Sequence, residues 1–261
     1  MKIFDFPQRS PEWFEIRKGV ITASRVGMFC AEPFGICLTV PEIKSALDAQ
    51  GIAYKGLTKR DDLLSILPNA DAYRRLVDPA QALIDEIMGE QADGDDRPPD
   101  FDTFWTKRGT EMEPIALADY ERRTGYTVEP VGFILHDCGK FGCSPDGLVS
   151  AKTWSLPKRG LEIKCPEGKT HLRYLREGVL PNEYVCQVHA SMAVTGLDRW
   201  DFFSFHPNLP PLLLTVERDN LTDNLERGLL LLAMEMRRHE IALAAKWREE
   251  FENIKDKERK P

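Results

Sequence analysis

Hydrophobic and polar positions in the first half of the chain recur with the period of amphipathic helices. Ser10 and Pro11 form a helix start signal, and Gly19 follows the end of the two-turn helix that they predict. The same reasoning predicts helices at 25–31, 80–88 and 103–124, and loops at 33–37 and 89–100. Pro114 lies inside the last helix and predicts either a kink or the start of its main part, because proline lacks an amide hydrogen.

The pattern changes after Gly125, where short runs with a period of two predict strands of a central sheet. These runs lie at 127–135, 141–144, 147–150, 160–165, 199–205 and 211–219. A helix with Asn182 as its N-cap is expected to end at Gly196, and a long charged helix over 223–251 leads into a frayed tail. We therefore expect an α/β (α+β) protein with a central mixed sheet flanked by helices.

Residues 38–67 carry two short amphipathic patterns separated by an extended stretch. This arrangement resembles helix-extension-helix modules of the SAP and HeH type, which bind nucleic acid. Acidic and basic residues cancel within the segment, so its attraction for phosphate is weak unless the basic residues share one face. The alternative is a helical hairpin that only packs on the main domain.

Composition indicates a globular chain rather than a membrane or secreted protein. The 261 residues, of which 42% are hydrophobic, suit one domain with a small insertion. No apolar run approaches the roughly 20 residues of a membrane helix, and the N-terminal residues lack an apolar signal segment. The six cysteines include no CxxC pair, so we expect reduced thiols and a cytoplasmic location. The net charge of −7 does not point to nucleic acid, although positive potential can be confined to a channel.

Candidate chemistry lies in the turn SPDG at 144–147 and the predicted strand GLEIKC. Strand alternation places Glu162 and Lys164 on one face, where a solvated surface pair is the alternative. Fifteen residues lie between Asp146 and Glu162, and one hairpin would bring the two carboxylates together. Two carboxylates suit Mg²⁺, and a neighbouring ammonium suits phosphodiester hydrolysis. The five histidines show no metal spacing, which argues against a histidine-based nuclease.

The segments CSPDGL and LEIKCP resemble the PD-(D/E)xK nuclease core, in the form found in the phage lambda exonuclease and YqaJ-type viral recombinase family. Three further segments resemble motifs of that family: RKGVITASR, WTKRGTEMEPIA and YVCQVHASMAVTG. The resemblance extends from about Ser10 to Val216 and implies a restriction-endonuclease-like fold. A single nuclease domain over 1–261 is expected, with the 38–67 insertion and a C-terminal helix and tail over 223–261.

The resemblance implies that Asp146, Glu162 and the main-chain carbonyl of Ile163 are ligands of Mg²⁺, for which Mn²⁺ is an alternative. It also implies that Lys164 is the catalytic lysine and that Glu113 is a helical acid near the metal. For Glu113 the alternative is a surface helix acid.

Further positions match the family's pattern in the flanking segments. Asp137 matches an acidic position upstream of the core, and an edge-turn aspartate is the alternative. Gln187 matches a glutamine of the family's helix, where it shares one face with Tyr184 and Ser191. A glutamine that only makes a buried structural hydrogen bond is the alternative.

Arg17, Ser24 and Ser144 correspond to positions that bind the phosphate of a 5′ end in the family. A guanidinium group and serine hydroxyls suit that ligand. For Ser24 the alternative is a plain helix N-cap, and for Ser144 it is the first corner of a turn.

The function that the resemblance implies is a Mg²⁺-dependent 5′-to-3′ exonuclease acting on double-stranded DNA ends. It would generate 3′ single-stranded overhangs for phage-type recombination. A homotrimeric ring and a single-strand-annealing partner are also implied, in the cytoplasm of a host cell if a phage encodes the chain. The alternatives are an endonuclease or resolvase with the same core, or a DNA-binding module without catalysis.

Overall fold

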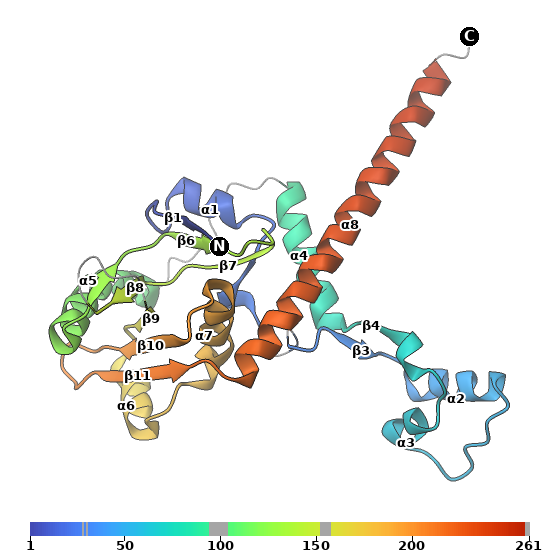
Figure 1. The fold of residues 1–261 in the computed structure, drawn as a ribbon, viewed down its shortest axis with the longest axis horizontal. Helices are drawn as coiled ribbons and strands as arrows, with labels where there is room; N and C mark the ends of the chain where they lie inside the picture. The colour runs from blue at the N-terminus through green and yellow to red at the C-terminus, as the bar shows by residue number, and fades with distance from the viewer. Residues whose placement is uncertain (28, 30, 94–103, 152–157, 259–261) are drawn as a thin grey trace.

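Two β-sheets with helices packed on them form the body of the protein, from which a helical insert and the C-terminal helix extend (Figure 1). The computed structural model describes residues 1–27, 29, 31–93, 104–151 and 158–258. Within these residues, no helix has the combination of length and apolar character needed to cross a membrane.

The larger sheet has five strands in the order β11-β10-β9-β8-β5. Their bounds are Leu212–Glu217 for β11, Arg199–Ser204 for β10, Arg159–Lys164 for β9, Gly147–Ser150 for β8 and Thr127–Glu129 for β5. β9 and β10 are parallel, whereas the other neighbours are antiparallel. The predicted mixed sheet is therefore present, and β8 and β9 form the predicted antiparallel pair.

Alternation along β9 sends neighbouring side chains to opposite faces of this sheet. Leu161 and Ile163 pack with Tyr120 of helix α5 (Phe104–Thr124) in one hydrophobic cluster. Glu162 turns to the other face, where helix α7 (Asn182–Thr195) lies. The predicted separation of apolar and charged residues along β9 is confirmed.

A second sheet has four strands in the order β1-β6-β7-β2. These strands span Lys2–Phe4, Phe133–Leu135, Phe141–Cys143 and Ile21–Thr22, respectively. The prediction of one central sheet is thus wrong for β6 and β7, because they pair with strands from the N-terminus rather than with β8. Such pairing depends on contacts between distant parts of the chain, which local periodicity does not report.

The N-terminal elements follow their start signals in part. Helix α1 (Pro11–Arg17) is confirmed, and the Ser10 hydroxyl accepts a hydrogen bond from the Trp13 amide. The helix predicted at 25–31 is instead a short 3₁₀ turn, η1 (Ala23–Arg25), and positions 28 and 30 lie outside the described residues.

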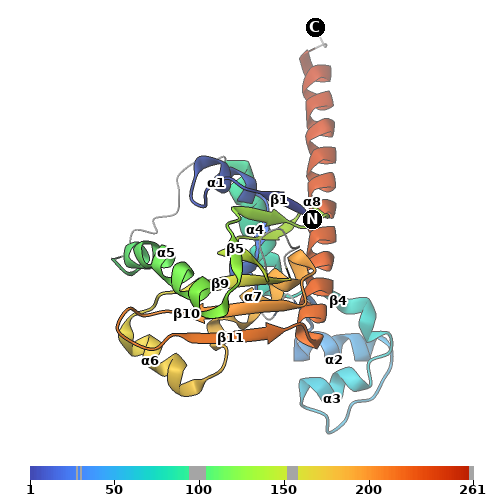
Figure 2. The same cartoon turned by 60° about the vertical axis from the view of Figure 1, so that its left-hand side comes forward.

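The helices of the second half differ from prediction mainly at their ends. Pro181 rather than Asn182 is the N-cap of α7, because its extended backbone precedes a residue that is already helical. Helix α6 (Gly168–Glu177) was not predicted. Helix α8 (Asn220–Glu258) is longer than the expected 223–251, because it begins earlier and ends later. It packs against α7 and α4 (Asp78–Asp93) and then extends away from the body (Figure 2).

Helix α4 also corrects the loop predicted at 89–100. It continues through Gly89 to Asp93, and positions 94–100 lie outside the described residues. Pro114 lies inside the continuous span of α5, so it does not end that helix.

The insert has its own hydrophobic core and is joined to the body by two paired strands. Its elements are β3 (Phe34–Ile36), α2 (Val40–Ala49), α3 (Arg60–Ser65), the 3₁₀ turn η3 (Ala70–Tyr73) and β4 (Arg74–Leu76). The loop predicted at 33–37 is wrong, because β3 pairs with β4 some 40 residues further along the chain. The two predicted helices are present, and they bury Ile43, Leu47, Leu63 and Leu67 against each other.

The separate core predicts that the insert can be removed without unfolding the body. Ile36 and Arg74 are paired across β3 and β4, so an Asn-Gly turn can replace residues 37–73. We expect the melting temperature of the shortened chain, followed by circular dichroism, to stay within about 3 °C of the wild type.

Two buried leucines provide matched controls for this deletion. Leu229→Ala in α8 is expected to destabilise the body by roughly 2–5 kcal/mol, whereas Leu63→Ala should affect the insert alone. Loss of the cooperative transition on deletion of the insert would contradict an independent core.

Candidate active site

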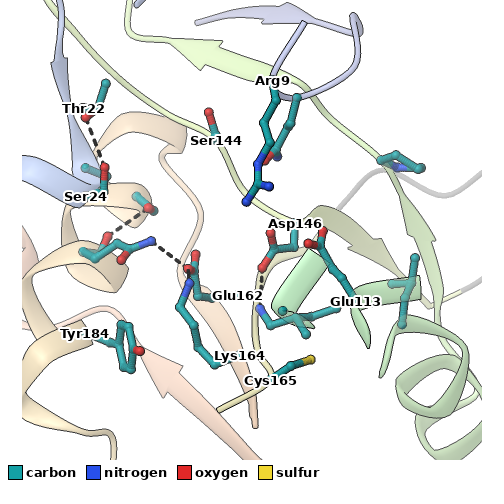
Figure 3. A pocket seen from close by; sticks show the side chains of 18 of the residues that line it. Arg9, Thr22, Ser24, Glu113, Ser144, Asp146, Glu162, Lys164, Cys165 and Tyr184 are labelled. Atoms are coloured by element: carbon teal, nitrogen blue, oxygen red, sulfur yellow. Dashed lines mark hydrogen bonds and ion pairs between the residues drawn. The ribbon is translucent and has the colours of Figure 1, made fainter. Parts of the chain in front are cut away.

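A cavity of about 890 Å³ opens between the larger sheet, α1, α5 and α7. Its wall includes the turn before β8, the end of β9 and the polar face of α7. Figure 3 shows the carboxylates and the lysine at its floor and the serines on its upper wall. Most of the residues singled out from the sequence therefore lie around one space.

The turn before β8 is fixed directly onto β9. The Asp146 amide donates to the Leu161 carbonyl at 3.0 Å. The Asp146 carboxylate in turn accepts a hydrogen bond from the Ile163 amide at 2.5 Å. These two bonds place Asp146 beside the segment of β9 that carries Glu162.

Glu162 is the most enclosed acid of the site, with 3% of its surface exposed. It accepts a hydrogen bond from Gln187 Nε2 at 2.7 Å and forms an ion pair with Lys164. The Lys164 Nζ lies 5.2 Å from the centre of the Tyr184 ring. The hairpin and α7 thus bring together Asp146 and these four residues.

The charges of these groups perturb one another. Burial raises the pKa of Asp146 well above its usual range, and the charge of Glu162 raises it further. Burial alone would lower the pKa of Lys164, but the Glu162 and Asp146 carboxylates outweigh it and raise the pKa. Lys164 is therefore an ammonium group that compensates two crowded carboxylates.

Glu113 reaches the same cavity from α5. Burial raises its pKa, as does Glu162, whereas Arg9 and Lys164 lower it. These interactions show that Glu113 is electrostatically part of the carboxylate cluster and not a separate surface acid. Glu113 is half-buried on the cavity wall, although Pro114 follows it directly in the helix.

The donor set fits a hard divalent cation. Burial and, after it, repulsion by the Glu162 carboxylate raise the pKa of Asp146, and a cation between the two carboxylates would relieve this unfavourable charge. No group of three or more His, Cys, Asp or Glu side chains in the described part of the chain is arranged to hold a metal. Mg²⁺ commonly takes one or two carboxylates and completes its shell with water and substrate phosphate. Asp146, Glu162 and the Ile163 carbonyl remain its predicted ligands.

Arg17 and Ser144 form a second polar group in the cavity. The Arg17 guanidinium stacks 3.9 Å from the centre of the Trp13 ring and donates to Ser144 Oγ at 3.2 Å. Trp13 Nε1 donates to the same oxygen at 2.9 Å. Because both neighbours can only donate, the Ser144 hydroxyl hydrogen is directed away from them.

Arg17 is a cation held partly out of water. Burial lowers its pKa to about 10, and the nearby charge of Arg25 contributes to this decrease. An anion bound beside Arg17 would compensate the free-energy cost of removing its guanidinium group from water. This pair of residues can therefore hold a phosphate group.

Ser24 lies on the cavity wall within η1, and its hydroxyl is 3.2 Å from that of Thr22. The N-cap of η1 is Thr22, so the reading of Ser24 as a plain N-cap is wrong. Ser144 lies in the short connection between β7 and β8 and also lines the cavity.

Asp137 is not among the residues that the structure brings together. Its side chain is 78% exposed and forms an ion pair with the N-terminal amine of Met1. That amine lowers the pKa of Asp137. The position matches an edge-turn aspartate rather than a support for the metal or for Lys164.

Sequence reasoning did not identify Gln8, Arg9, Trp13 or Thr22, which also line the cavity. Thr22 lies within the motif RKGVITASR, and Trp13 lies four residues before Arg17, so their nearness to Ser24 and Arg17 was a usable signal. No comparable signal marks Gln8 and Arg9, whose loop conformation depends on contacts with distant residues.

The chain is similar to known proteins over most of its length. Residues 73–198 match the family described as the YqaJ-like viral recombinase domain. An alkaline exonuclease (LHK-Exo) from Laribacter hongkongensis shares 27% sequence identity with a TM-score of 0.63, covering 92% of this chain and 99% of that chain. LHK-Exo in complex with dAMP gives 26% identity and a TM-score of 0.58, covering 90% and 99%. No curated protein matches the sequence.

These similarities confirm the resemblance to the viral recombinase exonuclease family that the motifs predicted. They also confirm the predicted fold class, because the mixed sheet and its flanking helices follow the fold of the alkaline exonuclease. They do not test the roles of single residues, so the assignments at the site stay predictions.

The carboxylate cluster predicts a metal-dependent change in stability. With metal chelated, Asp146→Asn should be at least as stable as the wild type, because it removes one of two repelling carboxylates. Adding Mg²⁺ should raise the melting temperature of the wild type but not that of Asp146→Asn. Differential scanning fluorimetry with and without Mg²⁺ measures both effects.

Asp137→Asn is the matched control, since it removes an exposed carboxylate away from the cavity. This variant should keep the full response to Mg²⁺. An equal response in Asp146→Asn would show that the ion binds elsewhere.

Proposed function

We propose that this chain, in which residues 73–198 match the YqaJ-like viral recombinase domain family, is a Mg²⁺-dependent 5′-to-3′ exonuclease of double-stranded DNA. The observation that carries the proposal is the presence of two groups in one cavity. One is the carboxylate cluster with Lys164, and the other is the Arg17 and Ser144 pair. A hydrolytic centre beside a phosphate pocket is what removal of terminal nucleotides requires.

Different residues of the cavity have different roles in such a reaction. Arg17 and the Ser144 hydroxyl bind the terminal phosphate, which sets the end of the strand in the cavity. Glu162 and Asp146 hold the cation, which supplies charge neutralisation and a more acidic water. Lys164 carries its positive charge next to Glu162, where it stabilises negative charge that develops on the scissile phosphate.

Gln187 has a positioning role in this scheme. Its amide nitrogen donates to Glu162 Oε1, so the other carboxylate oxygen would be available to hold the cation. Helix α7, which carries Gln187, is anchored by apolar residues such as Val188 and Met192 that are buried in the hydrophobic core.

The similar proteins support a nuclease of this type. The solved relative is described as an alkaline exonuclease, and one of its structures contains dAMP. A mononucleotide is the product that stepwise digestion of DNA releases. For this chain, we extend the proposal to generation of 3′ single-stranded overhangs that serve recombination by strand annealing.

The remaining expectations rest on the resemblance to phage recombination exonucleases. They are a homotrimeric ring around the DNA, a single-strand-annealing partner protein and a cytoplasmic location. A ring would reconcile the net charge of −7 with a DNA substrate, because positive potential could be confined to its channel. Light scattering gives the mass in solution and tests the trimer directly.

Linear and closed circular duplexes separate this function from its alternatives. We expect the wild type with Mg²⁺ to digest linear duplex and to leave the covalently closed circle intact. Asp146→Ala should lower the rate on linear DNA roughly 1,000-fold, since several kcal/mol of charge stabilisation depend on the cation. Cutting of the circle would favour an endonuclease or resolvase. Binding of DNA without hydrolysis in Mg²⁺ or Mn²⁺ would favour a DNA-binding module.

The phosphate pocket predicts a preference for 5′-phosphorylated ends. Arg17→Ala should slow digestion of a 5′-phosphorylated duplex roughly 10- to 100-fold, the range expected for a lost charged hydrogen bond. The same variant should have a smaller effect on a 5′-hydroxyl duplex. Arg122→Ala, which removes an exposed arginine of α5, is the control and should behave as the wild type. Equal losses on both substrates would assign Arg17 a structural role.

A further inference from the structure

Arg9 has a backbone conformation that favours glycine. Its φ angle is +67°, and in the described part of the chain only Asn69, with φ of +54°, shares a positive φ without being glycine. A side chain in this left-handed region costs free energy, and such residues often mark functional sites. Asparagine tolerates the conformation better than most residues, whereas arginine has no such advantage.

The loop that carries Arg9 is attached to the catalytic turn. Gln8 Nε2 donates to the Pro145 carbonyl at 2.8 Å and to the Val131 carbonyl at 3.1 Å. Pro145 lies between Ser144 and Asp146, so the loop is fixed to the residues that separate the phosphate pocket from the carboxylates. On its other side, Ser10 caps helix α1 and sets the direction of the chain.

The Arg9 side chain belongs to the wall of the active-site cavity. Figure 3 shows its guanidinium group directed toward the part of the cavity that Asp146 and Glu113 occupy. In the same view Ser24 lies on the far side of Ser144. Arg17 donates to Ser144, whereas the Arg9 guanidinium is directed at the carboxylates, so the two arginines are distinct cationic positions.

We propose that Arg9 binds the scissile phosphodiester itself, as a catalytic residue additional to Lys164. This inference rests on the proposed nuclease function. A guanidinium group offers paired donors for two phosphate oxygens, and the same cavity provides Lys164 on the other side of the carboxylates (Figure 3). Arg9 donates hydrogen bonds to non-bridging oxygens, on which negative charge increases in the transition state. Glycine would adopt this backbone conformation without strain, but it would supply no cationic side chain to the cavity.

Two glycine variants test this assignment under matched conditions. Arg9→Gly and Asn69→Gly each place glycine at a left-handed position, so neither backbone needs to change. Only the first variant alters the cavity. In single-turnover digestion of linear duplex, Asn69→Gly should match the wild type, whereas Arg9→Gly should be slowed roughly 10- to 100-fold.

Three further readouts separate catalysis from folding and from end binding. Guanidinium ion at low millimolar concentration should partly restore Arg9→Gly but not Asp146→Ala. Arg9→Lys should be intermediate, since it keeps the charge and loses the fork. The slowing in Arg9→Gly should be equal on 5′-phosphate and 5′-hydroxyl duplexes, in contrast to Arg17→Ala.

An Arg9→Gly variant as active as Asn69→Gly would overturn the assignment while leaving the proposed function in place. A defect confined to 5′-phosphorylated ends would also overturn it, by moving Arg9 to the terminal-phosphate pocket. A wild type without nuclease activity would overturn the proposed function and this inference together.

Discussion

Two carboxylates crowded at the floor of one cavity impose the main constraint on this protein. Asp146 and Glu162 repel each other, and burial makes their charges costly. The Ile163 amide, the Gln187 side chain and Lys164 compensate them. These partners come from β9 and α7, so the two elements must meet in one register. The arrangement costs stability in the free protein, and in the proposed function a bound cation would offset that cost.

The strand that carries this cluster is fixed on its opposite face by an unrelated set of contacts. Asp201 on β10 is 1% exposed and accepts hydrogen bonds from Tyr120 of α5, Arg159 of β9 and Thr215 of β11. Every one of these partners is a donor, so the buried carboxylate is fully compensated. The network joins three strands and α5. It gives the polar face of β9 a rigid support, which precise placement of catalytic groups requires.

Local patterns predicted those parts of the fold that local interactions determine. The alternation along β9, the β8 and β9 hairpin and the polar face of α7 follow from periods of two and 3.6 residues, and all are present. The patterns failed where distant segments pair. β6 and β7 joined strands from the N-terminus, and β3 formed only because β4 lies beside it. The left-handed conformation of Arg9 likewise depends on bonds from Gln8 to residues more than 120 positions away.

The turn before β8 joins the two chemical halves of the cavity by the shortest covalent path. Ser144 contacts Arg17, and Asp146 begins the carboxylate cluster, with Pro145 alone between them. Two residues of extended chain span at most about 7 Å, and proline limits how far that span can vary. In the proposed nuclease function, the length of this dipeptide would set the distance from the bound strand end to the bond that is cut, and with it the size of each step along the DNA.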